Sequence, residues 1–337
     1  MKKDGKTYDS DLKEYLYRTG GCMKRIFKKR FYISSWIVIV VLTWIVLYQT
    51  IGEKTISDSI PGSCTIFTAS YGEKILFGNN EDYNNPNTYY WVEPRSERNY
   101  GVVYFGFENF SLQGGINEKG LCFDANALPE ARLNPHPELP APPTEWVVKT
   151  IMKKAATVEE AMDIAGHYQR KNWGIPLKYQ IILADAKGGA AVISAGPDGE
   201  LAFTRKKQGE QYLVSTNFNR ANPENAYSYP CMRYDKAVEM LEKIEDENDL
   251  TVDYFKSILD AVHSEGASNN TLYSNIFDLQ KGIIYLYYWH QYDEVVMLNI
   301  SEQLARGNLC IRIRDLFSKE TVNKALAEYQ EYREKDN

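Results

Sequence analysis

Residues 64–82 read CTIFTASYGEKILFGNNED, and this stretch decides the fold. Its apolar pattern and the tight turn at Tyr71-Gly72 predict two strands joined as a hairpin. In such a hairpin the start of the first strand lies beside the end of the second. Cys64 and Asp82 are therefore expected to be neighbours. A thiol next to a carboxylate, directly after the loose Pro-Gly-Ser run at 61–63, indicates an active centre.

The hypothesis that follows is that Cys64 becomes the first residue of a mature enzyme. A free α-amino group has a pKa of about 7.7–8, so it can serve as a base at neutral pH. It would lie on the same residue as the thiol that it activates, and no histidine would be needed. Cleavage between Ser63 and Cys64 is accordingly predicted.

Composition supports a globular enzyme and argues against a nucleic-acid binder. The chain has 337 residues, 44% hydrophobic and 25% charged, which gives room for a sizeable core. Residues 1–63 hold 11 basic and 6 acidic side chains, which gives a net charge of +5. The remaining residues, 64–337, hold 28 basic and 39 acidic side chains, which gives a net charge of −11. A portion that acidic is not expected to bind nucleic acid.

The N-terminal part of the sequence has the pattern of a membrane anchor. A polar leader at 1–30 ends in the basic run MKRIFKKR, and residues 31–48 carry no charge. This length is close to the roughly 20 residues needed to span a bilayer. We therefore predict a transmembrane anchor or signal segment at 31–51 and a linker at 52–63, with the N-terminus in the cytoplasm and the catalytic domain at 64–337 outside.

Two other interpretations of the apolar run and the linker have less support in the sequence. A cleavable signal peptide is disfavoured because no small-residue cleavage site follows the apolar run. Gly-Ser-Cys superficially resembles a lipidation site, but the whole linker separates Cys64 from the apolar run. An uncleaved anchor is favoured, and cleavage before Cys64 would release the acidic domain from it.

From Cys64 onward the pattern alternates blocks of strands with helices. Strands are predicted at 100–107, 113–126 as a hairpin, 179–185, 189–194, 212–215, 283–298 as a hairpin, and 309–313. Helices are predicted at 144–152, 157–167, 231–245, 251–263 and 319–334, and the Pro-rich residues 128–143 form a loop. This order indicates a layered α+β architecture with mostly antiparallel sheets.

Four patches in order carry a resemblance to a known family. They are the run 64–82, Asn117-Glu-Lys-Gly-Leu121 with Asn126, Ser215-Thr-Asn-Phe-Asn219, and Tyr229-Pro-Cys-Met-Arg-Tyr234. Together they resemble the choloylglycine hydrolase and penicillin V acylase family, across roughly residues 64–300. The resemblance implies a four-layer αββα sandwich of the N-terminal-nucleophile hydrolase type, which uses no cofactor or metal and acts on small acyl amides.

The resemblance also implies roles for individual residues. Cys64 corresponds to the nucleophile and Asp82 to the carboxylate that holds the free amine. Asn126 and Asn217 correspond to polar groups around the oxyanion and the substrate amide, and Arg233 to the active-site arginine. Weaker candidates for substrate binding are Asn79, Asn80, Tyr83 and Trp91. One departure stands out, because Asn79 occupies the position where the family commonly has arginine.

Each of these residues also has a structural interpretation. Cys64 could be an inert buried thiol, Asp82 a turn residue, Asn126 and Asn217 loop residues, and Arg233 a surface cation. The four histidines, at 136, 167, 263 and 290, are interpreted as solvent-facing or satisfied rather than catalytic. Cysteine spacing fits no metal site; one bridge among Cys122, Cys231 and Cys310 stays open, with free thiols as the default.

Three functions remain after these considerations. The first is hydrolysis of a linear, non-peptide amide through a Cys64 thioester. The second is an acyltransferase of the same fold, which passes the acyl group to an amine. The third is a non-catalytic, membrane-tethered binding module, for which Asn79 in place of arginine is the main support. The sequence leaves the substrate open and is compatible with a homo-oligomer.

Overall fold

The computed structural model describes residues 64–128, 132–144, 146–170, 179–226 and 228–335. The chain divides into two compact units, Met1–Ser59 and Ile60–Asn337, and every described residue belongs to the second. The predicted leader, the apolar run at 31–51 and the linker lie outside the described residues. Within the described ranges, no helix is both long and apolar enough to cross a bilayer.

The first of two antiparallel sheets is built on the hairpin of residues 64–82. It has six strands in the order β10-β1-β2-β11-β12-β13. Their bounds are β1 Thr65–Tyr71, β2 Lys74–Tyr83, β10 Tyr212–Ser215, β11 Asn270–Asp278, β12 Ile283–Tyr288 and β13 Gln291–Asn299. Gly72 in the β1–β2 turn has a φ of 58°, a left-handed conformation that glycine adopts without steric cost.

The second sheet has eight strands in the order β14-β3-β4-β5-β6-β7-β8-β9, again all antiparallel. Their bounds are β3 Thr88–Glu93, β4 Val102–Phe107, β5 Leu112–Asn117, β6 Cys122–Ala127, β7 Tyr179–Ala184, β8 Ala190–Ala195, β9 Leu201–Arg205 and β14 Leu309–Arg312. Strand β6 sits in the middle of this sheet, so both of its faces are buried.

Six α-helices and two short 3-10 turns of the described residues connect and cover the sheets. They are α3 Val147–Lys154, α4 Val158–His167, α5 Met232–Leu241, α6 Val252–Ala261, α7 Ile300–Ala305 and α8 Lys319–Lys335, with a 3-10 turn η2 at Pro223–Asn225 and another, η3, at Ile313–Leu316. The Thr157 hydroxyl caps α4 by accepting a hydrogen bond from the Glu160 backbone N–H, 3.3 Å away. Threonine is one of the residues preferred at this capping position.

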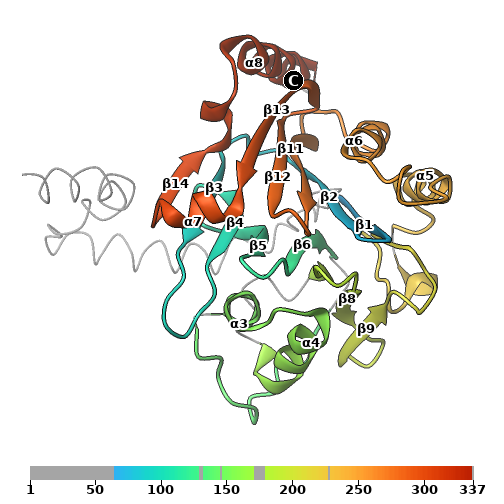
Figure 1. Cartoon of the computed structure of the whole chain (residues 1–337). Coiled ribbons are helices and arrows are strands. Elements are labelled where there is room, and N and C mark those ends of the chain that lie inside the picture. The colour runs from blue at the N-terminus through green and yellow to red at the C-terminus, as the bar shows by residue number, and fades with distance from the viewer. Residues whose placement is uncertain (1–63, 129–131, 145, 171–178, 227, 336–337) are drawn as a thin grey trace, which may run out of the picture. The chain divides into compact units, whose positions relative to one another are not determined.

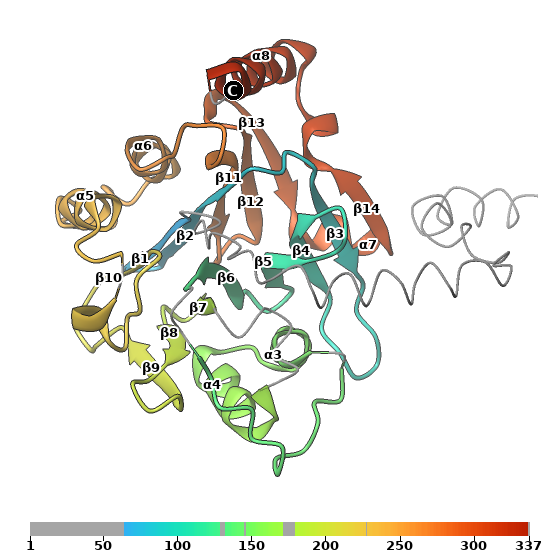
Figure 2. The same cartoon turned by 180° about the vertical axis from the view of Figure 1, so that it is seen from behind.

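Three apolar clusters define four layers, which Figures 1 and 2 show from opposite sides. Side chains of both sheets, such as Phe77 and Phe105, interdigitate in the central cluster. Helices α5 and α6 cover the outer face of the six-stranded sheet through Phe255 and its neighbours. Helices α3 and α4 cover the eight-stranded sheet around Ile151 and Phe123. The predicted α+β class with antiparallel sheets and an αββα layering is confirmed for this unit.

Most predicted elements are present, and four were missed. The predicted strand at 100–107 begins at Val102, and the loop at 128–143 contains no described helix or strand. Sequence patterns did not predict β3, β9, α7 or the central strand β11. The cysteines at 64, 122, 231 and 310 are all free thiols, so no bridge joins Cys122, Cys231 and Cys310.

Candidate active site

The β1–β2 hairpin brings Cys64 against Asp82, as the sequence predicted. Thr65 pairs with Asn80 in the register of the two strands, which places residue 64 opposite the end of β2. The Asp82 backbone N–H donates to the Cys64 Sγ over 3.5 Å. Cys64 is only 4% exposed, and Asp82 is fully buried. A sulfur and a carboxylate eighteen positions apart in the chain thus share one corner of the sheet.

Two hydroxyl groups hold the Asp82 carboxylate. Ser264 donates to Oδ2 over 2.8 Å, and the Thr271 hydroxyl donates to Oδ1. Thr271 is the β11 partner of Asp82, and the β-bulge that follows it shifts the register before Tyr273 pairs with Glu81. Hydrogen bonds from two donors favour the charged form of a carboxyl group. The predictions from sequence did not include Ser264 or Thr271.

Asn126 fixes the main chain of the cysteine from the other sheet. Its Nδ2 donates to the Cys64 carbonyl oxygen over 3.0 Å, and its Oδ1 accepts from the Ser215 hydroxyl at 2.5 Å. Gln180 in turn donates to the Ser215 hydroxyl over 3.2 Å. These bonds tie β1, β6, β7 and β10 together at the point where both sheets meet the cysteine.

Arg233 and Asn217 form a second polar group beside the strand start. The Arg233 guanidinium donates to the Thr65 hydroxyl over 2.6 Å and to the Asn217 Oδ1 over 3.2 Å. Asn217 Nδ2 donates to the Ala127 carbonyl over 3.2 Å. The five residues that the sequence assigned to the catalytic centre therefore lie together, with Arg233 reaching the residue next to Cys64 from helix α5.

A pair of buried acids lies on the inner face beside the thiol. Glu81 is 2% exposed and Asp124 fully buried, and burial raises the pKa of both carboxyl groups, with the charge of Asp124 further raising that of Glu81. The Tyr273 hydroxyl lies 3.5 Å from Glu81 Oε2, and Asp124 Oδ2 accepts no hydrogen bond. Burial, and then the charges of Glu81 and Asp82, raise the pKa of the Cys64 thiol.

Sequence reasoning missed this acid pair, although the pattern contained the signal. Glu81 precedes Asp82 directly, and Asp124 lies two residues before Asn126 on the same strand. Side chains two apart on a strand point to the same face, so Asp124 had to face the site together with Asn126. Gly114 on the neighbouring strand accommodates it, because a Cβ there would meet Asp124 Oδ2 at 2.2 Å.

Asn79 occupies the inner face of β2 without a polar partner. It is fully buried, and neither atom of its amide group makes a hydrogen bond. Its β11 partner Asn275 is also buried, and its amide group likewise makes no hydrogen bond. In the described structure no hydrogen bond therefore replaces the interactions that an arginine would make at this position.

The other weak candidates for substrate binding separate into two groups. Asn80 faces the helices, where it donates to the Leu259 carbonyl over 2.8 Å, so the structure places it outside the cavity. Trp91 packs in the cluster under α3 and α4 and, unlike what its candidacy for substrate binding implies, does not line the cavity next to Cys64. Tyr83 does line the cavity next to Cys64.

That cavity has a volume of about 200 Å³ and opens beside the sulfur. Its lining is mostly polar: Cys64, Glu81, Asp82, Tyr83, Asn85, Phe107, Asn109, Ser111, Gln113, Ala125, Ala127 and Tyr179. No histidine belongs to this lining within the described ranges, so a cysteine–histidine mechanism has no support at this place.

A strand that begins with a buried cysteine, at the edge between two stacked antiparallel sheets covered by helices, defines the class of N-terminal-nucleophile hydrolase folds. The family of acyl-coenzyme A:6-aminopenicillanic acid acyl-transferase matches residues 69–292, more than half of the chain. The chain therefore belongs to this family, to which the penicillin V acylase resemblance pointed. The match includes Asp82, Asn126, Asn217 and Arg233, and it begins five residues after Cys64.

Solved structures show the same fold. Penicillin V acylase from Agrobacterium tumefaciens is 17% identical, with a TM-score of 0.56 over 72% of this chain and 88% of that one. A variant of conjugated bile acid hydrolase from Clostridium perfringens is 16% identical, with a TM-score of 0.58 over 76% and 98%. A second variant of that hydrolase gives 16% and 0.53 over 74% and 96%. A comparison with curated protein sequences found no relative.

Proposed function

We propose that the chain is an amidase that hydrolyses a linear, non-peptide C–N amide with Cys64 as its N-terminal nucleophile. The observation that carries the proposal is the contact of the Cys64 sulfur with Asp82, while Asn126 holds the Cys64 carbonyl. Family membership and the shared fold of two amide hydrolases support the same reaction class.

Maturation comes first in this proposal. The Cys64 sulfur attacks the carbonyl carbon of Ser63, the peptide C–N bond breaks, and the proton of the thiol moves to the released amine. Water then hydrolyses the resulting thioester and leaves a Ser63 carboxylate and a free Cys64 thiol. The raised pKa of the buried thiol is consistent with a precursor that stays unreactive toward other substrates until this amine exists.

Turnover then uses the liberated amine as the base. The amine takes the proton of the thiol, and the thiolate attacks the amide carbonyl. The α-ammonium then gives that proton to the leaving amine as the tetrahedral intermediate collapses to a thioester. Water hydrolyses the thioester to the free acid and restores the thiol. Asp82 holds the α-ammonium form through its fixed carboxylate, since Thr271 and Ser264 prevent that carboxylate from rotating away. Asn217, whose Oδ1 accepts from Arg233, is the side-chain donor that this scheme assigns to the developing oxyanion.

The cavity narrows the substrate class. Ligand pockets for drug-sized molecules usually measure about 300–1,000 Å³, whereas the space beside Cys64 measures about 200 Å³. Asp82 lines it, and its carboxylate, whose charged form two hydroxyl donors favour, disfavours an anionic ligand. We therefore propose a short acyl group that is neutral or cationic as the part of the substrate that enters this space.

The second candidate is acyl transfer, which the name of the matching family favours. Here an amine instead of water attacks the Cys64 thioester, and the same residues act in the first half of the reaction. Incubation with an acyl amide and an excess of a second amine separates the two functions. A new amide in place of the free acid indicates the transferase.

The decisive experiment combines mass spectrometry with a substrate panel. We expect the purified protein to contain a chain that begins at Cys64, and Cys64→Ala to remain uncleaved and inactive on neutral, cationic and anionic acyl amides. Cys310→Ser serves as the control, because this half-buried thiol lies on β14 outside the cavity. A fully active precursor would refute the maturation step, and Cys64 labelling by a thiol probe no faster than Cys310 would favour the binding module.

For the location of the protein we propose an anchor at 31–51 with the catalytic domain outside the cytoplasm. The support is the uncharged run that follows the basic segment at 23–30. Protease added to intact cells should digest the domain after residue 63, or should find it already released. Protection of the domain in intact cells and its digestion after lysis would contradict the proposed orientation.

A further inference from the structure

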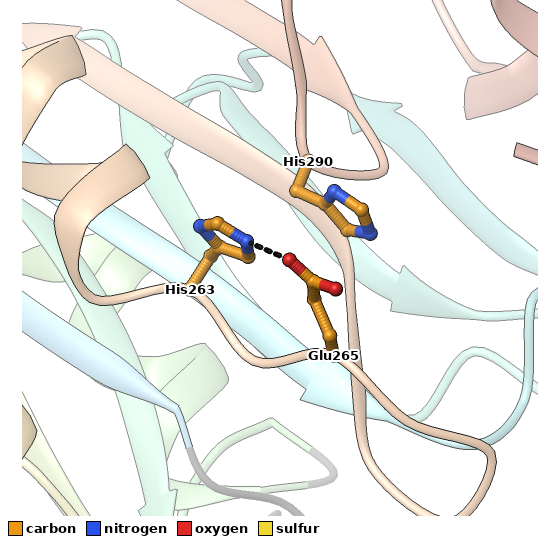
Figure 3. A group of neighbouring side chains, drawn as sticks. All are labelled: His263, Glu265 and His290. Carbon is orange, nitrogen blue, oxygen red and sulfur yellow. Dashed lines mark hydrogen bonds and ion pairs between the residues drawn. The ribbon is translucent and has the colours of Figure 1, made fainter. Parts of the chain in front are cut away.

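A second cluster of side chains that can bind a metal ion lies near the Asp82 carboxylate. His263 and Glu265 belong to the segment after α6, and His290 lies in the turn between β12 and β13 (Figure 3). One ligand atom from each residue lies within 4.8 Å of the others. Figure 3 shows the Glu265 carboxylate rising between the two imidazole rings. The amidase mechanism uses none of these three residues.

The hydrogen bonds of His263 leave a lone pair facing a carboxylate. Its Nδ1 contacts the backbone carbonyl oxygen of Asp260, which can only accept, so Nδ1 carries the hydrogen. In the neutral ring, Nε2 then offers a lone pair toward Glu265 Oε1, 2.9 Å away. Two acceptor atoms at that separation require either a second proton on the ring or a metal ion that both can bind. A ligating imidazole that donates its other N–H to a carbonyl is the usual arrangement at metal sites.

His290 supplies a second ring nitrogen that makes no hydrogen bond. Its side chain is 9% exposed, and its buried Nε2 makes no hydrogen bond, although Glu328 Oε2 lies 3.2 Å away. The ring stacks on His263 with centroids 4.8 Å apart and planes 13° from parallel. Because the lone pair of an imidazole lies in the ring plane, the two rings must rotate out of this stack when both bind one divalent cation.

Neighbouring groups hold the three side chains in place. Tyr332 donates to Glu265 Oε2 over 3.0 Å, and Asp260 Oδ1 lies 3.5 Å from His263 Nδ1. Trp289 and Gln291, on either side of His290, donate to the two oxygens of Glu328 on helix α8. The cluster thus joins the segment after α6, the β12–β13 turn and α8.

We infer that His263, Glu265 and His290 form a binding site for Zn²⁺ or a divalent ion of the same class. Two imidazole nitrogens and one carboxylate oxygen are a ligand set that zinc prefers, with bonds of about 2.0–2.2 Å. Four such ligands around one ion lie roughly 3.3 Å apart by tetrahedral geometry, so the three ligand atoms, which lie within 4.8 Å of one another, close up by as much as about 1.5 Å when they bind the ion. A fourth position is left for water or for Glu328.

The site is coupled to the active centre through one residue. Ser264 lies between two of the ligands, and its hydroxyl donates to Asp82 Oδ2 over 2.8 Å. Its backbone N–H and carbonyl both bond to Thr271, the other donor to Asp82. An ion that fixes residues 263 and 265 therefore fixes Ser264 between them. His263 and Glu265 act in this inference as positioning residues for the catalytic carboxylate.

Isothermal titration of the untagged full chain with Zn²⁺, after treatment with EDTA, tests the inference. We expect one ion for each chain, and at least tenfold weaker binding in His263→Ala, Glu265→Gln and His290→Ala. The matched control is His167→Ala, an exposed histidine at the end of α4, which should bind as the wild type does. Repeating the titration with Cys64→Ala excludes binding by the catalytic thiol.

Two further measurements keep the result interpretable. Circular dichroism and thermal unfolding in EDTA show whether each variant folds, and Zn²⁺ should raise the melting temperature of the wild type and of His167→Ala but not of the cluster variants. Co²⁺ should give the visible absorption of a four-coordinate site in the wild type only. Wild-type protein that binds no ion, or folded cluster variants that bind as tightly as wild type, would overturn the inference. None of these measurements requires turnover.

Discussion

Replacing Glu81 with glutamine should change how the stability of the protein depends on pH. The Glu81 carboxyl group is buried between the sheets beside Asp124, and burial together with the neighbouring charges raises its pKa well above the usual value. A raised pKa means that the folded state holds a proton which the unfolded state has already lost. Folding is then progressively disfavoured as the pH rises from the unfolded pKa toward the folded one.

The magnitude follows from linkage. Within that pH window, each carboxyl group reduces the free energy of unfolding by up to about 1.4 kcal/mol for each pH unit. Between pH 5.5 and 7.5, the wild type should therefore lose up to about 2.7 kcal/mol that Glu81→Gln retains. Glutamine has nearly the same shape as a protonated glutamate and keeps a partner for the Tyr273 hydroxyl, which lies 3.5 Å from Glu81 Oε2.

Denaturant unfolding of the purified chain at several pH values is the assay. The difference in free energy of unfolding between Glu81→Gln and the wild type should grow with pH. Glu97→Gln, which changes an exposed carboxyl group, should run parallel to the wild type. Because the charge of Asp124 raises the pKa of Glu81, Glu81→Gln combined with Asp124→Asn should have less effect than the sum of the two single changes. Parallel curves for Glu81→Gln and the wild type would refute the assignment of a raised carboxyl pKa.

Two further variants test the geometry of the site. Thr271→Val removes a donor to Asp82, so it should lower the free energy of unfolding by about 1–3 kcal/mol and slow maturation. The control is Thr68→Val, which removes a hydroxyl bonded to a backbone carbonyl on the β1–β2 hairpin and should leave the rate of maturation unchanged. Equal rates of maturation in the two variants would contradict the role of Thr271. Gly114→Ala places a Cβ 2.2 Å from a buried carboxylate and should cost about 1–3 kcal/mol in thermal unfolding, whereas Gly166→Ala has open space in α4 and should be neutral or stabilising. A Gly114→Ala protein as stable as the wild type would show that the acid can move aside.

The sequence sufficed for the parts of the site that are local. A seven-residue strand, a glycine turn and a second strand place Cys64 and Asp82 together whatever surrounds them. Asn126, Asn217 and Arg233 came from motifs, and their meeting point required the fold. The residues behind Asp82 could not be predicted in this way, because Ser264 and Thr271 are separated from it by more than 180 positions along the chain.

The missed strand β11 shows why periodicity failed at the centre of the sheet. Its residues read NTLYSNIFD, and polar side chains such as Asn270, Ser274 and Asn275 interrupt the apolar pattern. All nine residues are nevertheless buried, because the strand lies between β2 and β12. Buried polar residues in a central strand are costly unless they serve a site. Thr271 and Tyr273 do serve it, so the local signal was weakest where the function lies.

The acid pair and Asn79 together bear on how the thiol is activated. In this site the position expected to hold arginine carries a neutral amide, and Glu81 and Asp82 both raise the pKa of the Cys64 thiol. Arg233 contacts the Thr65 hydroxyl over 2.6 Å and so lies on the outer side of the strand. In the function proposed above, an α-amino group released by cleavage before Cys64 would then supply the cation that stabilises a thiolate. Activity in the proposed enzyme should therefore depend on that cleavage more strictly than in a relative that keeps the arginine.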